Sequence, residues 1–532
     1  MALELVAGAA ETPLSPTLFL ERAAAVFAER TAIVDGGRSL SYGEFAERCR
    51  RLASALVDSG LAPGGRVAAL CTNSHVMLEL HHGVPLAGAV LVPLNFRLTA
   101  DDLAYMVGHC GAALLVATAE LAPLAAEVAE RSGIRLLVEG DGGYEAFLAG
   151  AAATSRAAPE EHSLLAINYT SGSTGQPKGV MYNHRGAYLQ ALAMAFHLRL
   201  GTESRYLWTL PMFHCDGWCI TWAVTAAGGE HRCLRLFDPA AAWAELAAGG
   251  ITHLSAAPTV LTMIAEAASQ PAAAPPRRAV AATTGGAPPS PALLERLAAL
   301  ELTVTHLYGL TESYGPAVTN VWQPAWSAES PAAQAALNAR QGIGNVVSGG
   351  LRVLAQDGSE VPADGETIGE IALRGNNVMA GYYADPEATA AAVRDGWLFT
   401  GDLGVCHPDG YVELRDRAKD IIITGGENVA SVEVERALAA HPAVLESAVV
   451  AAPDATWGEV PYAFVTLKAG AEVSGEELIS FCRERLAHFK APRAVRFSAL
   501  PKTATGKVQK HVLRAELAAA QTIVQPPSTQ ST

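Results

Sequence analysis

One segment of the chain combines glycines with hydroxyl groups and a lysine, and it directly follows the apolar run 164–167. It reads YTSGSTGQPKGV and spans residues 169–180. The glycines let the backbone curl, while the hydroxyl and ammonium groups can donate to phosphate oxygens. The residues predicted to bind phosphate are Thr170, Ser171, Gly172, Ser173, Thr174, Gly175 and Lys178. A strand that leads into such a loop is typical of a phosphate-binding site.

Two familiar loops do not fit this segment. A Walker loop needs Gly-x4-Gly-Lys-Ser/Thr opening a helix, but here Pro177 precedes Lys178 and Gly179 follows it. A hydrolase elbow, Gly-x-Ser-x-Gly, would require glycine where Ser171 stands. The alternative is a flexible surface loop. A cluster of glycines and hydroxyls is a specific device for binding anions, and it favours the phosphate interpretation.

The segment resembles the phosphate-binding signature of the adenylate-forming superfamily, which includes acyl-CoA synthetases, luciferases and the adenylation domains of nonribosomal peptide synthesis. YGLTES, at 308–313, resembles the second motif of that family. The resemblance implies that Tyr308, beside Gly309, stacks on adenine. It further implies that Thr311 contacts phosphate and that Glu312 holds magnesium. An aromatic face suits a purine, and a carboxylate suits a hard cation.

Two later segments follow in the order of the family. TGDLG, at 400–404, resembles the ribose motif and assigns Asp402 to the ribose hydroxyls. RDRAKDIIITGGENVASVEVE, at 415–435, resembles the hinge motif, in which Arg417 lies near the ribose and Lys419 is the pivot. The resemblance also places Gly425 and Gly426 beside the thiol tunnel of coenzyme A.

The last motif, PKTATGKVQK at 501–510, resembles the C-terminal catalytic loop, whose lysine is Lys507 here. The resemblance implies that a carboxylate attacks the α-phosphate of ATP while magnesium on Glu312 and the ammonium groups of Lys507 and Lys178 neutralise negative charge. Pyrophosphate leaves, and the small domain then swings about the hinge so that coenzyme A can accept the acyl group. ATP, Mg2+ and coenzyme A are therefore the expected cofactor and co-substrates.

The acid side is less clearly marked. PMFHCDGW, at 211–218, resembles the segment that lines the acid pocket, which assigns His214 and Trp218 to it. An unpaired carboxylate of Asp216 facing this pocket would disfavour a purely aliphatic acid, because a buried charge is costly. The sequence leaves open whether Asp216 and His214 face inward, and a lone histidine is more often structural than catalytic.

TTGGAP, at 283–288, resembles the strand and turn that form the floor of the pocket and the adenine slot. The residues assigned in this way are Thr284 to the pocket and Gly285, Gly286 and Ala287 to the nucleotide. The expected substrate is a short-chain, medium-chain or aryl carboxylic acid. The acceptor stays open between coenzyme A and a carrier protein, an amine or a small nitrogen nucleophile such as nitrite.

A catalytically silent nucleotide-binding protein is a further alternative. The set Lys178, Glu312, Asp402, Arg417 and Lys507 is intact, which argues against it. A zinc site is another alternative, because His214, Cys215, Cys219, His231 and Cys233 cluster in the sequence. Their spacing fits zinc only loosely, and the interleaved apolar residues favour a packed segment.

The elements that must position these motifs change character along the chain. Strand, helix and strand alternate over 66–94 and again over 111–150, which predicts a largely parallel sheet. After residue 350, short alternating strands separated by Asp-Gly turns predict an antiparallel or barrel-like subdomain. From about residue 420 the pattern predicts a small α+β domain. The expected fold class is α/β, with layered α/β subdomains, a barrel-like β subdomain and a small mobile C-terminal domain.

The predicted domains are 1–418, an N-terminal adenylate-forming domain; 419–520, a C-terminal mobile AMP-binding domain; and 521–532, a disordered tail. A chain of 532 residues with 50% hydrophobic and 17% charged residues can bury more than one core. Its net charge of -15 gives no basic surface for nucleic acid. The N-terminus does not resemble a secretory signal and no apolar run is long enough to span a bilayer, so we expect a cytoplasmic protein with reduced cysteines. The expected partner is a small carboxylic acid, and homodimerisation stays open.

Overall fold

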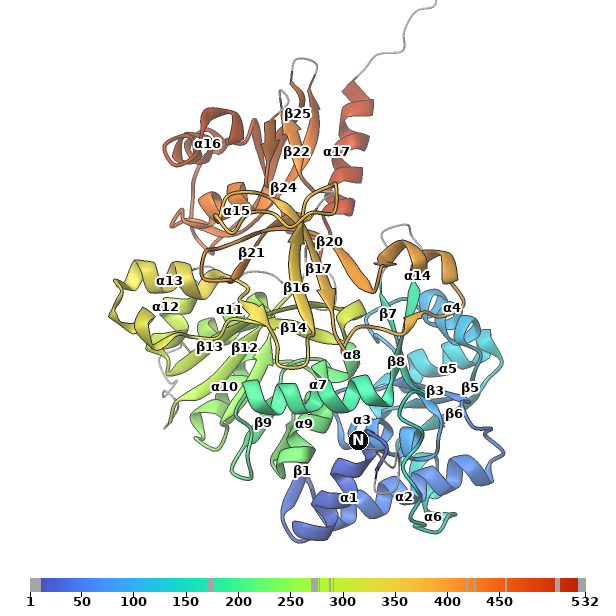
Figure 1. Cartoon of the computed structure of the whole chain (residues 1–532). Coiled ribbons are helices and arrows are strands. Elements are labelled where there is room, and N and C mark those ends of the chain that lie inside the picture. Colours follow the sequence, from blue (N-terminus) through green and yellow to red (C-terminus); the bar gives the residue numbers. More distant parts are fainter. Residues whose placement is uncertain are drawn as a thin grey trace, which may run out of the picture.

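A computed structural model gives the fold, in which a large domain carries a smaller one at the C-terminal end of the chain (Figure 1). It describes residues 11–140, 142–170, 177–268, 276, 278–286, 289, 291–417, 420–424, 427–454, 457–502 and 508–524. The large domain holds two α/β sheets and an antiparallel sheet, and the small domain holds a fourth sheet. The predicted α/β class is therefore confirmed.

The first α/β sheet has seven strands in the order β18-β8-β7-β4-β3-β5-β6. Its strands are β3 (Arg66–Leu70), β4 (Val90–Pro93), β5 (Ala112–Ala117), β6 (Arg135–Val138), β7 (Leu164–Thr170), β8 (Lys178–Asn183) and β18 (Gly381–Tyr382). The strands from β7 to β6 run parallel, and β8 and β18 are antiparallel additions. Strand β3 is apolar on both faces because alternate residues enter two different cores, as a parallel strand covered on both sides requires.

Helices cover both faces of this sheet (Figure 1). They are α2 (Tyr42–Asp58), α3 (His75–Leu86), α4 (Ala100–Cys110), η1 (Ala119–Leu121), α5 (Ala122–Ser132), α6 (Tyr144–Ala149) and α14 (Pro386–Ala392). The strand that precedes α2 ends at Ser41, because Ser41 caps this helix in a capping box with Glu44 and Tyr42 already belongs to the helix.

The second α/β sheet has nine strands in the order β15-β14-β13-β12-β11-β9-β10-β1-β2. They are β1 (Thr31–Asp35), β2 (Arg38–Ser41), β9 (Arg205–Trp208), β10 (Glu230–Cys233), β11 (His253–Ala256), β12 (Val280–Thr284), β13 (Leu302–Leu310), β14 (Gly315–Thr319) and β15 (Ile343–Gly344). Strands β13, β12, β11, β9, β10 and β1 run parallel.

Other helical elements belong to the same half of the large domain. They are α1 (Thr17–Val26), α7 (His184–His197), α8 (Cys215–Trp218), α9 (Ile220–Ala227), α10 (Pro239–Ala247), α11 (Pro258–Ala267), α12 (Pro291–Ala299), η2 (Thr311–Ser313), η3 (Pro324–Ala328) and α13 (Pro331–Ala339). Buried residues of α10, α11 and α12 share one core with the sheet strands beside them.

The antiparallel subdomain predicted after residue 350 is present. Its strands are β16 (Gly350–Leu354), β17 (Gly369–Arg374), β19 (Val393–Arg394), β20 (Trp397–Cys406) and β21 (Val412–Arg417). Strand β20 pairs with β17 on one side and β21 on the other, in an open five-stranded sheet rather than a closed barrel.

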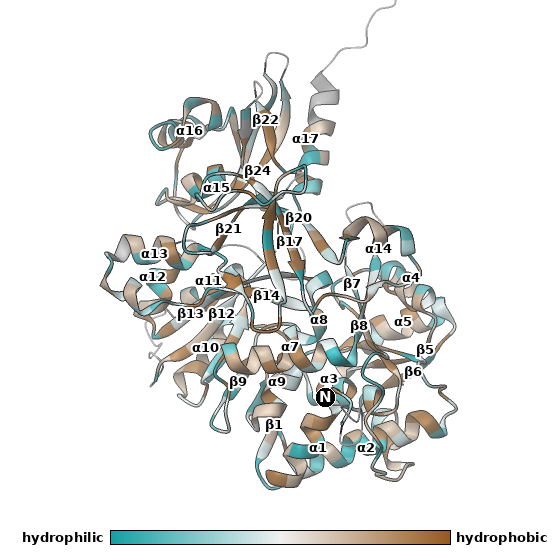
Figure 2. Ribbon diagram, in the orientation of Figure 1, coloured by the Kyte–Doolittle hydropathy of each residue, from teal (hydrophilic) through white to brown (hydrophobic). Residues whose placement is uncertain are grey.

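The small domain is the predicted α+β unit. It consists of β22 (Ile422–Thr424), β23 (Glu427–Val429), α15 (Ser431–Ala439), β24 (Val444–Asp454), β25 (Gly458–Leu467), α16 (Gly475–Arg483), η4 (His488–Lys490), β26 (Ala494–Phe497) and α17 (Lys510–Val524). Figure 2 shows hydrophobic residues along strands such as β22, and Ile422 of this strand packs with α15 and α16 in the core of the domain.

The predicted domain boundary at 418/419 lies outside the described residues and stays a prediction. The disordered tail was predicted to begin at residue 521, but α17 continues to Val524. Residues 525–532 lie outside the described part of the chain, and for them the tail stays a prediction. Within the described chain, no helix combines the length and the apolar character that crossing a bilayer requires.

Candidate active site

Four of the described site residues stand at or near the carboxyl ends of parallel strands in the two α/β sheets. Thr170 ends β7, Thr284 ends β12, and Tyr308 and Gly309 lie near the end of β13. Carboxyl ends of parallel strands are where open α/β sheets bind ligands, because the loops that follow them diverge. The hydroxyl of Thr284 is buried and has no hydrogen-bond partner among the described residues.

Tyr308 and Asp402 meet although they are far apart in the sequence. The Tyr308 hydroxyl donates to Oδ2 of Asp402 at 2.8 Å, and both side chains are buried. Asp402 is on β20, where its register partner on β21 is Arg417. The antiparallel sheet thus brings the predicted ribose residue to the predicted adenine residue.

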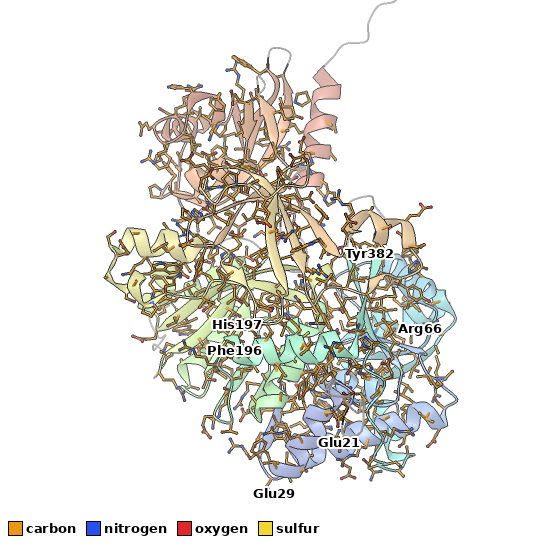
Figure 3. All side chains as sticks on the ribbon, in the orientation of Figure 1. Glu21, Glu29, Arg66, Phe196, His197 and Tyr382 are labelled. Carbon is orange, nitrogen blue, oxygen red and sulfur yellow. The ribbon has the colours of Figure 1, made fainter. Side chains whose placement is uncertain are left out.

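Glu312 and Lys178 are joined through a tyrosine that the sequence did not single out. The Tyr382 hydroxyl donates to Oε1 of Glu312 at 2.8 Å, and Nζ of Lys178 lies 5.1 Å from the centre of the Tyr382 ring. Lys178 also pairs with Asp385 at 3.8 Å. Figure 3 shows Tyr382 close to α14. Burial and the charge of Glu312 raise the pKa of Tyr382 above its usual range, so its hydroxyl stays a donor.

Two hydrogen bonds to backbone carbonyls fix the turn that carries Thr311 and Glu312. The Tyr182 hydroxyl donates to the Thr311 carbonyl at 2.6 Å, and the Met379 amide donates to the Glu312 carbonyl at 2.8 Å. A β-carbon at Gly309 would lie 1.9 Å from the carbonyl oxygen of Gly315, so this close approach of β13 to β14 requires glycine.

Several predicted site residues lie outside the described part of the chain, and their assignments stay predictions. They are Ser171, Gly172, Ser173, Thr174, Gly175, Ala287, Lys419, Gly425, Gly426 and Lys507.

In the segment predicted to line the acid pocket, the Trp218 ring packs against two glycines. A β-carbon added at Gly285 would lie 3.0 Å from Cη2 of Trp218, and one added at Gly315 would lie 3.2 Å from Cδ1. Gly286, in contrast, is exposed with φ of 86°, and a β-carbon added there would meet nothing within 4 Å. Trp218, in the segment predicted to line the acid pocket, therefore packs against Gly285 of the predicted nucleotide segment and against Gly315 at the start of β14.

Trp218 belongs to a short left-handed turn. Five consecutive residues, 215–219, have φ between 48° and 63°, and four of them are not glycine. His214 precedes the turn and is half-buried. Left-handed backbone costs an L-residue roughly 1–2 kcal/mol, so surrounding contacts must hold this turn in place.

Asp216, within this turn, is fully buried. Oδ2 accepts a hydrogen bond from the Tyr314 hydroxyl at 2.7 Å, and Oδ1 lies 3.4 Å from Nε2 of His81. The carboxylate is thus enclosed by tyrosine and histidine and is not left unpaired.

The loose zinc pattern does not form a site around His231. Nδ1 of His231 accepts from Nε1 of Trp208 at 3.1 Å, and its Nε2 lies 3.1 Å from the Thr225 hydroxyl. Burial lowers the pKa of His231 to about 3, so the ring is a neutral core group.

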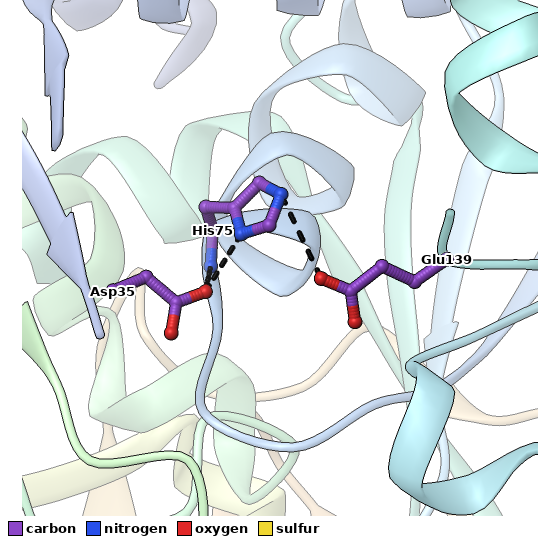
Figure 4. Close-up of side chains that lie close together, drawn as sticks. All are labelled: Asp35, His75 and Glu139. Atoms are coloured by element: carbon purple, nitrogen blue, oxygen red, sulfur yellow. Dashed lines mark hydrogen bonds and ion pairs between the residues drawn. The ribbon is translucent and has the colours of Figure 1, made fainter. Parts of the chain in front are cut away.

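A different group of metal-type side chains, Asp35, His75 and Glu139, gathers between the two α/β sheets (Figure 4). Nδ1 of His75 lies 2.6 Å from Oδ2 of Asp35, and its Nε2 lies 3.9 Å from Oε1 of Glu139. The Arg235 guanidinium pairs with both carboxylates. Because an arginine already compensates the acids, this cluster is an ionic link between the sheets.

Comparison with known proteins decides the family. The family model "AMP-binding enzyme" matches residues 20–383, and the model "AMP-binding enzyme C-terminal domain" matches residues 433–507. The chain belongs to the AMP-binding enzyme family.

Individual members of the family match nearly the whole chain. Acetate--CoA ligase CCL3 of Humulus lupulus is 43% identical over 538 residues, covering 95% of each chain. 4-Hydroxybutyrate--CoA ligase 2 of Metallosphaera sedula is 40% identical over 520 residues, covering 94% of each. The crystal structure of ATP-bound MatB from Rhodopseudomonas palustris superimposes with a TM-score of 0.82 at 30% identity, covering 94% of this chain and 99% of that one.

The described residues suit the ligands that the family uses, ATP and Mg2+. Glu312 offers a carboxylate for a hard cation, Lys178 offers a cation for phosphate, and the hydroxyl of Thr284 has no acceptor among the described residues and could donate to a ligand. The sequence interpretation missed Tyr182, Tyr382 and the buried pair of His81 with Asp216. Tyr382 stands in a Tyr-Tyr pair and gives a weak signal, whereas nothing in the sequence marks His81.

Proposed function

We propose that this chain is an AMP-forming acid:CoA ligase that activates a short-chain carboxylic acid. The observation that carries the proposal is the joining of Glu312 and Lys178 through Tyr382, with Glu312 just after β13, the strand that carries Tyr308 and its hydrogen bond to Asp402. This arrangement puts a cation-binding carboxylate, a phosphate-binding ammonium and an aromatic ring next to one another, as adenylation requires.

The residues then divide the reaction between them. Tyr308 and Asp402 orient the nucleoside, and Lys178 together with the loop that starts at Thr170 holds the phosphates. Magnesium on Glu312 would neutralise charge on the phosphates during attack by the acid. Lys507 would add positive charge in this first step, and rotation about Lys419 would bring Gly425 and Gly426 to the thiol.

The short acid is supported by the position of Trp218. Its indole packs against both Gly285 and Gly315. We infer that the acyl chain extends toward this ring, which would limit the length of the chain. The relatives named for acetate and for 4-hydroxybutyrate agree with a small substrate.

The test is release of pyrophosphate with acetate, butyrate, hexanoate, octanoate and benzoate, each with and without coenzyme A. We expect acid-dependent release that is fastest with acetate or butyrate, and thioester only when coenzyme A is present. Release that does not depend on any acid would contradict the ligase function. Acyl-AMP that accumulates without passing to coenzyme A would point to another acceptor.

Trp218→Ala tests the acid side separately. Removing the ring should raise kcat/KM for hexanoate relative to butyrate by about tenfold or more, since each extra methylene in an apolar site contributes roughly 1 kcal/mol or more. The KM for ATP should stay the same. Unchanged selectivity would show that Trp218 does not limit the chain length.

A further inference from the structure

The left-handed turn 215–219 stands next to the proposed acid site, and something must hold it. Cys215, Asp216, Trp218 and Cys219 all have positive φ, a conformation that L-residues avoid. A right-handed or extended backbone here would move the Trp218 ring away from the two glycines that it fits. The acid-facing geometry therefore depends on whatever fixes this turn.

The most extensive polar anchor of the turn is the Asp216 side chain. The hydroxyl of Tyr314, the residue that precedes β14, donates a hydrogen bond to Oδ2 of Asp216 at 2.7 Å. The Asp216 carbonyl accepts from the Thr221 hydroxyl at 3.0 Å, which ties the turn to α9. Both Asp216 and Tyr314 are almost wholly buried, so water does not compete for these bonds.

His81 completes the surroundings of the carboxylate from α3. Its Nδ1 lies 2.7 Å from the Met77 carbonyl and donates to it, so Nε2 is the nitrogen turned toward Oδ1 of Asp216. The two atoms are 3.4 Å apart without hydrogen-bonding geometry. The Tyr314 hydroxyl is consequently the one side-chain group among the described residues that donates a hydrogen bond to this carboxylate.

The ring of Tyr314 has a separate role. It stacks on Tyr182 with the ring centres 3.6 Å apart and 8° between the planes, and Tyr182 holds the Thr311 carbonyl. Removing only the Tyr314 hydroxyl keeps the stacked ring on the nucleotide side but releases Asp216 on the acid side. The two functions of this residue can therefore be separated by experiment.

We propose that Asp216, held by the Tyr314 hydroxyl, is a positioning residue that fixes Trp218 in the left-handed turn and thereby sets the length of acid that the site accepts. This inference rests on the proposed ligase function. Neither residue needs to touch the substrate, because the effect is transmitted through the backbone of the turn to the indole.

The test compares Tyr314→Phe with Tyr144→Phe in the full chain. Tyr144 is a matched control, because its buried hydroxyl also donates to a fully buried carboxylate, Glu79, at 2.8 Å, and the two residues belong to α6 and α3 rather than to the turn 215–219. Tyr314→Phe should raise kcat/KM for hexanoate relative to butyrate by about tenfold, as expected for loss of a hydrogen bond to a charged group. The KM for ATP should change less than about twofold, because the stacked ring remains.

Asp216→Asn and Asp216→Ala provide a second comparison. Asparagine tolerates left-handed backbone and can still accept from Tyr314, so it should keep the selectivity for butyrate. Alanine can do neither and should lose that selectivity to the same extent as Tyr314→Phe or more. If Asp216→Ala does not fold, Tyr314→Phe alone still decides.

The proposal is overturned if Tyr314→Phe leaves the selectivity unchanged, if Tyr144→Phe changes it equally, or if only the KM for ATP moves. These outcomes are distinct from failure of the proposed function. If the proposed ligase function itself were wrong, the unmodified chain would release no pyrophosphate with any of the acids, and no selectivity could be measured.

Discussion

Glu79 and Asp216 are two fully buried carboxylates in the same large domain, and the fold treats them differently. Glu79 receives two hydrogen bonds from the Arg48 guanidinium, at 2.6 and 3.2 Å, and one from the Tyr144 hydroxyl. Asp216 receives one from Tyr314, while its other oxygen faces His81 without a hydrogen bond.

The backbones that carry the two carboxylates also differ. Glu79 lies inside the regular helix α3, whereas Asp216 lies in the left-handed turn. The carboxylate that joins structural elements is thus fully compensated on a relaxed backbone. The one beside the site is incompletely compensated on a strained backbone, as is common where function constrains geometry.

The first prediction concerns Glu79, the carboxylate whose charge is compensated by Arg48. Arg48→Met removes the cation next to Glu79 and should lower the free energy of unfolding by about 3–5 kcal/mol, because a buried charge is left uncompensated. Burial opposes the charge of Arg48, but hydrogen bonds to Glu145 and the charge of Glu79 raise its pKa, which reflects the same interaction. Urea unfolding measures the change. A loss below about 1 kcal/mol would show that Glu79 is not held in this way.

The second prediction removes the corresponding neighbour of Asp216, the His81 ring. His81→Gln removes the ring that faces Asp216 but leaves the Tyr314 bond, so the loss should be smaller, about 1–3 kcal/mol. Unfolding of this variant is compared with that of Arg48→Met under identical conditions. An equal or larger loss would mean that Asp216 depends on His81 as fully as Glu79 depends on Arg48, and the contrast between the regions would fail.

The third prediction uses pH to examine the ionic link between the sheets. Burial would raise the pKa of Asp35, but hydrogen bonds from His75 and the charge of Arg235 outweigh it and hold this pKa below the ordinary 3.8. Such a group stabilises the fold above about pH 4, and the contribution is lost as the pH falls through the folded pKa.

Asp35→Asn should therefore be less stable than the unmodified chain at pH 6, and the difference should shrink as the pH falls below 3.8. Urea unfolding of both proteins at a series of pH values from 6 to below 3.8 measures this difference in the free energy of unfolding. A difference that does not depend on pH would exclude the carboxylate as the source.

The smallest expected effect belongs to an exposed ion pair. Arg51 and Glu47 lie one helical turn apart on α2, with 35% and 53% of their side chains exposed. Arg51→Met should change the free energy of unfolding by no more than about 1 kcal/mol, because solvent screens such pairs. A loss as large as that of Arg48→Met would show that burial is not what separates the two arginines.

Much of the architecture followed from the sequence. Alternation of strand and helix predicted the parallel sheets, and Asp-Gly turns predicted the antiparallel subdomain, because both patterns are local in the chain. The motifs around Thr170, Tyr308 and Asp402 could be aligned with a family from their residues alone. Element ends were harder to predict, as at the start of the predicted tail, where residues 521–524 continue helix α17.

The sequence determined which chemical groups are present and in what order, since glycine, hydroxyl and charged residues carry their chemistry locally. Only the tertiary structure decided which of them meet. Tyr382 reaches Glu312 across 70 residues, and Tyr314 reaches Asp216 across 98. Such contacts depend on how separate sheets pack, and no spacing within a single segment encodes that packing. The orientation of Asp216 away from solvent, with the left-handed turn around it, is the clearest case.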